Sequence, residues 1–255
     1  MNDGENHLKV FLAGKKENPR FWARFGGKPD FKGKRVLDVG CGTGSLCLDI
    51  SLSGAKQVVG VDIDPVKIAF ANAHIKKQFP EEYEKIDYKV SDLKDIPDSS
   101  FDCIVTKDTF EHVMHFEDFF AELIRILKKG GHLYSGFGPL YRSPFGFHRR
   151  LRRIFPILKL LKHPIPWIHL LFTDSAILNR VNRKEGSRYR SIPEYGLNKM
   201  TFAEFIKIFK NSGLSIKYLE VNVANHVFSK IISFFRQISF LREYFTYNVY
   251  VIFKK

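Results

Sequence analysis

The chain has 255 residues, of which 44% are hydrophobic and 15% aromatic, so it is long enough to bury one sizeable core. No stretch reaches the roughly 20 uninterrupted apolar residues that a membrane span needs, and Met1 is followed by polar residues. We therefore expect one cytoplasmic domain, 1–255, whose three cysteines are reduced packing residues.

The formal net charge of +14 is distributed unevenly along the chain. Residues 1–122 carry 17 Lys and Arg against 21 Asp and Glu, whereas residues 123–255 carry 24 against 6. No acidic residue occurs between Leu123 and Thr173, a stretch that holds ten Lys and Arg. The N-terminal half of the chain is therefore mildly acidic and the C-terminal half strongly basic.

Short β-rich runs alternate with helical apolar patterns up to Phe137. The helical stretches are typified by AELIRILKK (121–129), and the runs are RVLDVG (35–40), VVGVDI (58–63), DYKV (87–90), FDCIVT (101–106) and GHLYSGF (131–137). This alternation predicts an α/β fold with parallel strands, crossover helices and ligands at the carboxyl ends of the strands. Before the first run, Phe21 and Trp22 are expected either to pack beneath a helix or to fold over a cofactor.

The alternation stops after Phe137. About sixty residues rich in Pro, Arg and aromatic side chains follow, and we interpret 138–200 as an inserted substrate cap. TFAEFIKIFKNSG (201–213) then predicts an amphipathic helix, and LSIKYLEV (214–221) and YNVYVIFKK (247–255) predict two strands. Residues 201–255 would thus complete the sheet.

The first predicted strand leads into a loop with glycines at 40, 42 and 44. Glycine lets the backbone turn tightly and approach a ligand, and we expect Thr43 or Ser45 to cap the helix that follows. A dinucleotide fingerprint fits poorly, because it requires Gly or Ala where this chain has Ser45. Asp38, at the end of the strand, would also repel a pyrophosphate and attract a cation.

Two further carboxylates follow the next two strands. Asp62 ends the second strand, twenty residues after Gly42, and can accept both hydroxyls of a ribose. Asp92 follows the third strand, where it can accept a hydrogen bond from an adenine amino group while Leu93 or Ile63 contacts the ring. S-adenosylmethionine, which carries a sulfonium and an ammonium group but no phosphate, suits this set of three carboxylates.

The segments VLDVGCGTG, VVGVDIDP, SDLKDIP, FDCIVTKDTFEHV and ELIRILKKGGHLY, in this order, resemble the class I S-adenosylmethionine-dependent methyltransferases, in particular their small-molecule, methyltransferase-11-like branch. The resemblance covers 33–138 and marks it as the cofactor-binding core. It implies a Rossmann-like seven-stranded sheet with an antiparallel last strand, helices on both faces and the inserted cap after the fifth strand. It also implies S-adenosyl-L-methionine as the cofactor, bound by Asp38, Gly40, Cys41, Gly42, Gly44, Asp62, Ile63, Asp92, Leu93, Lys107 and Asp108.

The sulfonium is already an activated methyl donor, so the protein mainly aligns the acceptor and excludes water. The candidate bases for an alcohol or phenol acceptor are His148, which we prefer, His112 and Tyr141. An equally ordinary interpretation packs Tyr141 inside the cap, leaves His148 at the surface and gives His112 an orienting role. His112 and His115 could share a helix face, but their order is not that of a zinc site, so we expect no metal.

The segment HRRLRRIFPILKLLKHPIPWIHLLF (148–172) combines basic and apolar residues without an acid. It fits a cap for an anionic or lipid-linked acceptor, a peripheral contact with an anionic membrane, or an RNA-binding surface. Prolines at 156, 164 and 166 prevent one continuous helix, which weakens the membrane interpretation. TKDT after the fourth strand lacks the Asn/Asp-Pro-Pro-Tyr of common base methyltransferases.

The sequence therefore predicts an enzyme that transfers a methyl group from S-adenosylmethionine to a small or medium-sized organic acceptor. An RNA methyltransferase acting on ribose or tRNA is the alternative within enzymes. A non-catalytic S-adenosylmethionine-binding protein at a membrane surface is the alternative outside them. The acceptor, the methylated atom and the oligomeric state are not predicted.

Overall fold

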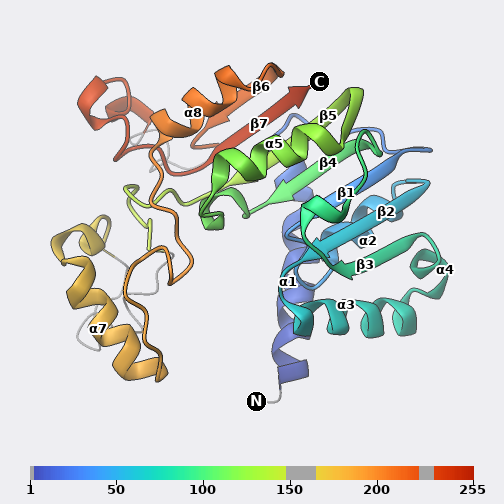
Figure 1. The fold of residues 1–255 in the computed structure, drawn as a ribbon, viewed down its shortest axis with the longest axis horizontal. Coiled ribbons are helices and arrows are strands. Elements are labelled where there is room, and N and C mark those ends of the chain that lie inside the picture. The colour runs from blue at the N-terminus through green and yellow to red at the C-terminus, as the bar shows by residue number, and fades with distance from the viewer. Residues whose placement is uncertain (1–2, 148–164, 224–232) are drawn as a thin grey trace.

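A seven-stranded sheet with helices against both faces forms the centre of the molecule (Figure 1). The computed structural model describes residues 3–147, 165–223 and 233–255. The strands, in the spatial order β3-β2-β1-β4-β5-β7-β6, are β1 (Arg35–Val39), β2 (Gln57–Asp62), β3 (Ile86–Val90), β4 (Phe101–Lys107), β5 (Leu127–Phe137), β6 (Ser215–Val221) and β7 (Val249–Lys254). The helices are α1 (Asp3–Ala23), α2 (Ser45–Ser51), α3 (Pro65–Gln78), α4 (Pro80–Tyr83), α5 (Phe116–Ile126), α7 (Asp174–Glu185) and α8 (Phe202–Asn211), with short 3-10 turns η1 (Leu93–Asp95), η2 (Phe110–His112), η4 (Ile168–Leu171) and η5 (Ser239–Leu241).

Strand direction follows the predicted pattern. The neighbouring strands from β3 to β5 pair in parallel, and β7 pairs antiparallel with both β5 and β6. The predicted Rossmann-like α/β fold with an antiparallel last strand is therefore confirmed. Because β1 and β4 lie side by side at the centre, the loops that follow them meet at the switch point of the sheet, where ligands of such folds bind.

Alternate residues of β1 face opposite helical layers, as the two-residue period of a strand requires. Val36 packs in a hydrophobic cluster with residues of α1, α2 and α3, whereas Leu37 and Val39 pack in a second cluster with α5 and α8. The second cluster is rich in phenylalanine, with the ring centroids of Phe116 and Phe205 4.8 Å apart. Each buried Phe contributes roughly 1.5–3 kcal/mol, so this layer anchors the edge of the sheet that carries β7 and β6.

The first helix, α1, packs its aromatic residues against the sheet. Phe21 and Trp22 are both buried in the cluster with α2 and α3, and their ring centroids lie 4.8 Å apart. Trp22 Nε1 donates to Asp49 Oδ2 of α2 at 2.7 Å. The two aromatic residues therefore pack beneath a helix, the first of the two expected arrangements.

After β5 the chain leaves the sheet, and we call residues 138–200 the insertion. Its described residues contain η4, α7 and a separate hydrophobic cluster of Tyr141, Phe147, Ile177, Leu178, Val181, Ile192 and Leu197. Helix α7 begins where the Thr173 hydroxyl accepts the Ala176 N–H at 3.2 Å, and it ends at Gly186, whose φ is 67°. Figure 1 shows α7, in yellow, away from the sheet and beyond its edge.

The last predicted helix and strands are confirmed. Helix α8 begins with a reciprocal capping box, in which Thr201 and Glu204 each bind the other's backbone N–H, and β6 and β7 follow. One local prediction is wrong, because neither Thr43 nor Ser45 caps α2. The N-cap is Gly44 with φ 84°, and no side chain binds there, since the chain enters α2 in a left-handed conformation.

The three cysteines, Cys41, Cys47 and Cys103, are free and buried, as predicted. No helix among the described residues is long and apolar enough to cross a membrane.

Candidate functional site

The glycine loop, residues 40–44, leaves β1 and is held by neighbouring strands. The N–H groups of Gly40 and Cys41 both donate to Val61 O of β2, at 2.8 and 3.0 Å. On one side Thr109 Oγ1 donates to Val39 O at 3.1 Å, and on the other Tyr88 Oη of β3 donates to Gly44 O at 3.0 Å. The loop is therefore fixed before any ligand arrives.

The three glycines of this loop have different surroundings. A Cβ on Gly40 would lie 2.5 Å from Thr109 Oγ1, and a Cβ on Gly44 would lie 2.5 Å from Tyr88 Oη. Gly42 has a φ of 54°, and a Cβ there would meet no atom within 4 Å. Gly40 and Gly44 are thus required by packing inside the protein, whereas Gly42 leaves open space that a ligand can occupy.

Asp62, at the carboxyl end of β2, ties that strand to the glycine loop. Its Oδ2 accepts the Gly42 N–H and its Oδ1 accepts the Asp64 N–H, both at 2.9 Å. Each carboxylate oxygen has a second lone pair, so these bonds leave acceptor capacity for a ligand. The next residue, Ile63, is 89% exposed, which places an apolar surface beside this carboxylate.

Asp92 and Leu93 follow β3 and begin η1. Asp92 Oδ1 accepts the Lys94 N–H at 3.2 Å, which fixes the carboxylate at the start of the turn. The Leu93 side chain is buried in the cluster with α5, and its carbonyl accepts Arg125 Nη2 at 3.0 Å. Of the two apolar residues expected to contact a ring, Ile63 is therefore the exposed one.

Asp38 lies beneath the glycine loop, on the sheet face that packs against α1 and α2. Its carboxyl group is buried and accepts Cys47 Sγ at 3.1 Å. Burial raises the pKa of Asp38 to about 7, although the Cys47 thiol and the Lys107 charge act in the opposite direction. Desolvation therefore disfavours the charged form of Asp38 in the free protein, and a cationic ligand beside it would favour that form.

Two ionisable residues, Lys107 and Asp108, lie at the end of β4, next to Asp38 and the glycine loop. Lys107 Nζ donates to Asn18 Oδ1 of α1 at 3.1 Å, and burial lowers the pKa of its ammonium group. Asp108 has a φ of 52°, and burial raises its pKa against the nearby charges of Lys107 and Arg24. Asn18 also donates to Ser45 O at 3.0 Å, so α1 closes one side of the site. Nothing in the residue type or position of Asn18 pointed to this role.

Glu111 is buried between the end of β4 and the insertion. Its Oε1 accepts the Gly138 N–H and its backbone carbonyl accepts the Asn198 N–H, both at 3.0 Å. Its Oε2 has no hydrogen-bond partner among the described residues. Burial, followed by the charge of Asp108, raises the pKa of Glu111 well above its usual range. Burial therefore favours the protonated form of this carboxyl group, and that form can donate a hydrogen bond from Oε2.

His112 and His115 do not share a helix face, so that expectation is wrong. His112 ends η2 and its Nδ1 lies 2.6 Å from Gly196 O, whereas His115 is exposed and is the N-cap of α5. A carbonyl oxygen can only accept, so Nδ1 carries the hydrogen and the neutral ring has its basic lone pair on Nε2. Among the described residues, no group of three or more His, Cys, Asp or Glu side chains is arranged to hold a metal ion.

Asn198 joins the end of the insertion to η2. Its Nδ2 donates to Phe110 O at 2.7 Å and to Val113 O at 2.8 Å, and its Oδ1 accepts the Met200 N–H at 3.1 Å. We expect Asn198→Ala to lower the free energy of unfolding by about 1–3 kcal/mol, because two partly buried carbonyls lose their donor. Chemical denaturation measures this loss. Asn198→Asp, which cannot donate, should be at least as unstable; wild-type stability in both variants would contradict the assignment.

Tyr141 lies in the hydrophobic cluster of the insertion. Its hydroxyl donates to Asp174 Oδ1 at 3.1 Å, Lys199 Nζ lies 4.6 Å from its ring centroid, and Lys199 pairs with Asp174 at 2.7 Å. Burial raises the pKa of the Tyr141 hydroxyl, which therefore remains protonated at neutral pH. His148, the preferred base, lies outside the described residues, as does 148–164 of the basic segment 148–172.

Comparison with known proteins points to one family for the glycine-loop region. Residues 37–135 match the model of the family described as a methyltransferase domain. Norajmaline N-methyltransferase of Rauvolfia serpentina is 34% identical over 104 residues, which are 40% of this chain and 35% of that protein. The mitochondrial ubiquinone biosynthesis O-methyltransferase of Mus musculus is 40% identical over 111 residues, 42% of this chain and 29% of that one. The matched region thus spans only about a third of these relatives.

Solved structures extend the likeness to the whole fold. An S-adenosylmethionine-dependent methyltransferase from Mesorhizobium loti has a TM-score of 0.58 at 19% identity, over 94% of this chain and 97% of that one. A geranyl diphosphate C-methyltransferase from Streptomyces coelicolor has a TM-score of 0.57 at 13% identity, over 94% and 78%. At these identities the likeness concerns the fold alone.

Proposed function

We propose that this protein transfers a methyl group from S-adenosylmethionine to a small or medium-sized organic acceptor, because residues 37–135 match the methyltransferase-domain family. The observation that carries the proposal is the open space at Gly42, bordered by Asp62 and the exposed Ile63, at the carboxyl edge of the sheet. A fixed loop, a carboxylate and an apolar surface are what a nucleoside with a cationic tail requires.

The residues of the site fit this cofactor. S-adenosylmethionine, when bound, supplies a methyl group activated by its sulfonium. Asp62 would accept the ribose hydroxyls, Ile63 would pack on the adenine ring and Asp92 would accept the adenine amino group. The remaining contacts would come from the glycine loop and from the ends of β1, β3 and β4, namely Asp38, Gly40, Cys41, Gly42, Gly44, Leu93, Lys107 and Asp108.

The acceptor would lie between the glycine loop and the insertion. There the protein holds it in line with the donated methyl group and excludes water. His112, with its lone pair on Nε2, is the candidate base among the described residues for an acceptor that must lose a proton. Glu111, whose burial favours the protonated carboxyl group and whose Oε2 has no partner among the described residues, is suited to position an acceptor by donating a hydrogen bond. The Tyr141 hydroxyl already donates its hydrogen to Asp174, so it is suited to position an acceptor only by accepting a hydrogen bond.

The names of the relatives support a small-molecule acceptor, because they include an alkaloid N-methyltransferase and ubiquinone biosynthesis O-methyltransferases. Calorimetry with S-adenosylmethionine and with NAD tests the cofactor, and binding of NAD alone would refute it. Incubation with methyl-labelled cofactor and separate metabolite, lipid and RNA extracts tests the acceptor. Label only in RNA would refute the acceptor class, and tight binding without transfer to a broad acceptor panel would identify a non-catalytic binding protein.

Cofactor affinity should depend on pH through Asp38. A bound sulfonium favours the ionised carboxylate and so lowers the pKa of Asp38 from its free value of about 7. Affinity should therefore rise with pH, up to about eightfold between pH 6 and pH 7.5. Calorimetry of the wild type and of Asp38→Asn measures this rise. The variant should have a flat profile over the same range, and equal profiles in the two proteins would exclude Asp38 as the titrating group.

A further inference from the structure

The segment just before β7, residues 233–246, exposes large apolar side chains. Phe240 is 74% exposed and Phe234 is 64% exposed, and Phe235, Ile238 and Tyr244 are exposed to a smaller degree. We call 233–246 the C-terminal segment. Single exposed apolar residues are ordinary on protein surfaces, but five within eleven positions of one segment are a concentration of the kind found at interaction sites.

The C-terminal segment is docked on the beginning of α8. Glu243 accepts the N–H groups of Phe202 at 2.7 Å and Ala203 at 3.0 Å, so both of its carboxylate oxygens are used there. The Arg236 guanidinium lies 4.9 Å from the ring centroid of Phe202 and donates to Thr246 Oγ1 at 2.9 Å. The apolar side chains are thus presented by a segment with a defined position.

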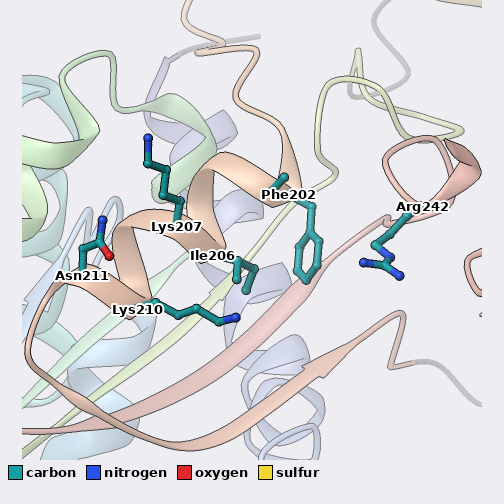
Figure 2. A pocket seen from close by; sticks show the side chains of 7 residues that line it. Phe202, Ile206, Lys207, Lys210, Asn211 and Arg242 are labelled. Atoms are coloured by element: carbon teal, nitrogen blue, oxygen red, sulfur yellow. The ribbon is translucent and has the colours of Figure 1, made fainter. Parts of the chain in front are cut away.

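A basic groove lies beside this segment (Figure 2). It is lined by Phe202, Ala203, Ile206, Lys207, Lys210, Asn211 and Arg242, without an acidic residue. Figure 2 shows Lys210 and Arg242 extending from opposite sides toward the apolar Phe202 and Ile206. In the part of the chain that the structure describes, Lys207, Lys210 and Arg242 form no ion pair with a carboxylate.

The combination of aromatic side chains with Lys and Arg is complementary to the surface of an anionic bilayer. Phe and Tyr insert at the boundary between headgroups and acyl chains, and basic side chains bind anionic headgroups. A second copy of this chain is disfavoured, because a two-fold contact would bring this groove toward its own copy and set like charges close together.

We propose that the C-terminal segment and the basic groove form a docking surface for anionic membranes. The C-terminal segment lies at the carboxyl edge of the parallel strands, because it leads into β7 at Val249, which pairs with Phe137 at the end of β5. A membrane bound there adjoins the edge that carries the glycine loop. Docking does not depend on methyl transfer, so it can be tested separately.

Sedimentation with vesicles tests the docking surface. The full-length protein should bind phosphatidylcholine vesicles that contain 25% phosphatidylglycerol about tenfold or more tightly than phosphatidylcholine alone, and high salt should weaken this binding. Phe234→Ser with Phe240→Ser should weaken binding about tenfold or more. Val10→Ser with Leu12→Ser, at comparably exposed positions of α1, is the matched control and should bind like the wild type.

A second pair of variants tests the groove. Lys207→Gln with Lys210→Gln should reduce binding to the anionic vesicles roughly 10- to 30-fold, whereas Lys56→Gln with Lys77→Gln, which removes the same charge from the opposite end of the sheet and from α3, should have a much smaller effect. Unchanged vesicle binding in the Phe234/Phe240 and Lys207/Lys210 variants would overturn the proposal. Dimerisation through these residues, measured by light scattering, or binding of an RNA oligomer but not of vesicles, would overturn it as well.

Discussion

Gly42→Ala should weaken S-adenosylmethionine binding roughly 10- to 100-fold while leaving the protein folded. Gly42 is the glycine of the loop whose added Cβ would meet no protein atom, so the methyl group would enter the space proposed for the cofactor. Extra carbon in a closely packed site costs about 1–3 kcal/mol. Alanine at position 42 must also adopt the left-handed backbone conformation, which lowers the free energy of unfolding by about 1–2 kcal/mol. This loss of stability has to be distinguished from the loss of cofactor affinity.

Gly130→Ala is the matched control for that experiment. Gly130 also has a positive φ, 79°, and a Cβ there would likewise meet no atom within 4 Å, but it lies in β5 near the opposite edge of the sheet. Calorimetry should find wild-type affinity in Gly130→Ala and a similar loss of unfolding free energy in both variants. If Gly42→Ala binds the cofactor as tightly as Gly130→Ala does, the proposed position of the cofactor is wrong.

Asp62→Ala should weaken S-adenosylmethionine binding by about 1–3 kcal/mol, because charge-assisted hydrogen bonds to the ribose are lost. The structure adds a second effect. Asp62 also holds the N–H groups of Gly42 and Asp64, so its loss loosens the glycine loop and lowers stability. Calorimetry and thermal unfolding measured on the same samples report both changes.

Asp64→Ala separates the two effects of Asp62→Ala. The Asp64 side chain caps α3 by accepting the N–H groups of Val66 and Lys67, and its loss should cost about 1 kcal/mol of stability. Its carboxylate is engaged with α3 and not with the glycine loop, so cofactor affinity should stay within about twofold of the wild type. Equal affinities in Asp62→Ala and Asp64→Ala would remove the assignment of Asp62 to the ribose.

The sheet was predictable because its strands depend on local pattern. β1, β2 and β4 are rich in β-branched residues and end at or just before Gly40, Asp62 and Asp108. Helix α8 begins with the capping box of Thr201 and Glu204. The entry into α2 was not predictable in the same way. Thr43 and Ser45 are good capping residues, but the conformation of Gly44 is set by Tyr88 of β3, which is 44 positions away in the sequence.

The electrostatics of the site depend on burial, which the sequence does not reveal. Asp38 was expected to be a charged group, yet its surroundings include the Cys47 thiol and leave its carboxyl group desolvated. The raised pKa of Glu111 likewise follows from its burial and from the charge of Asp108, neither of which can be inferred from the sequence. Asn18 of α1 contacts the site through Ser45, 27 positions away in the sequence, and through Lys107, 89 positions away. No local sequence pattern predicts such long-range contacts.

The two bonds of Glu111 have a consequence for how this protein can diversify. Its side chain holds the residue at which the chain departs from the sheet, Gly138, and its backbone holds Asn198, where the chain returns. A single residue thus binds both ends of the insertion, and these ends remain adjacent whatever sequence lies between them. Because the two ends are held together, the segment between them can become longer or shorter, or be replaced by an unrelated sequence, without strain on the sheet. New substrate recognition can therefore evolve by changes confined to this one segment.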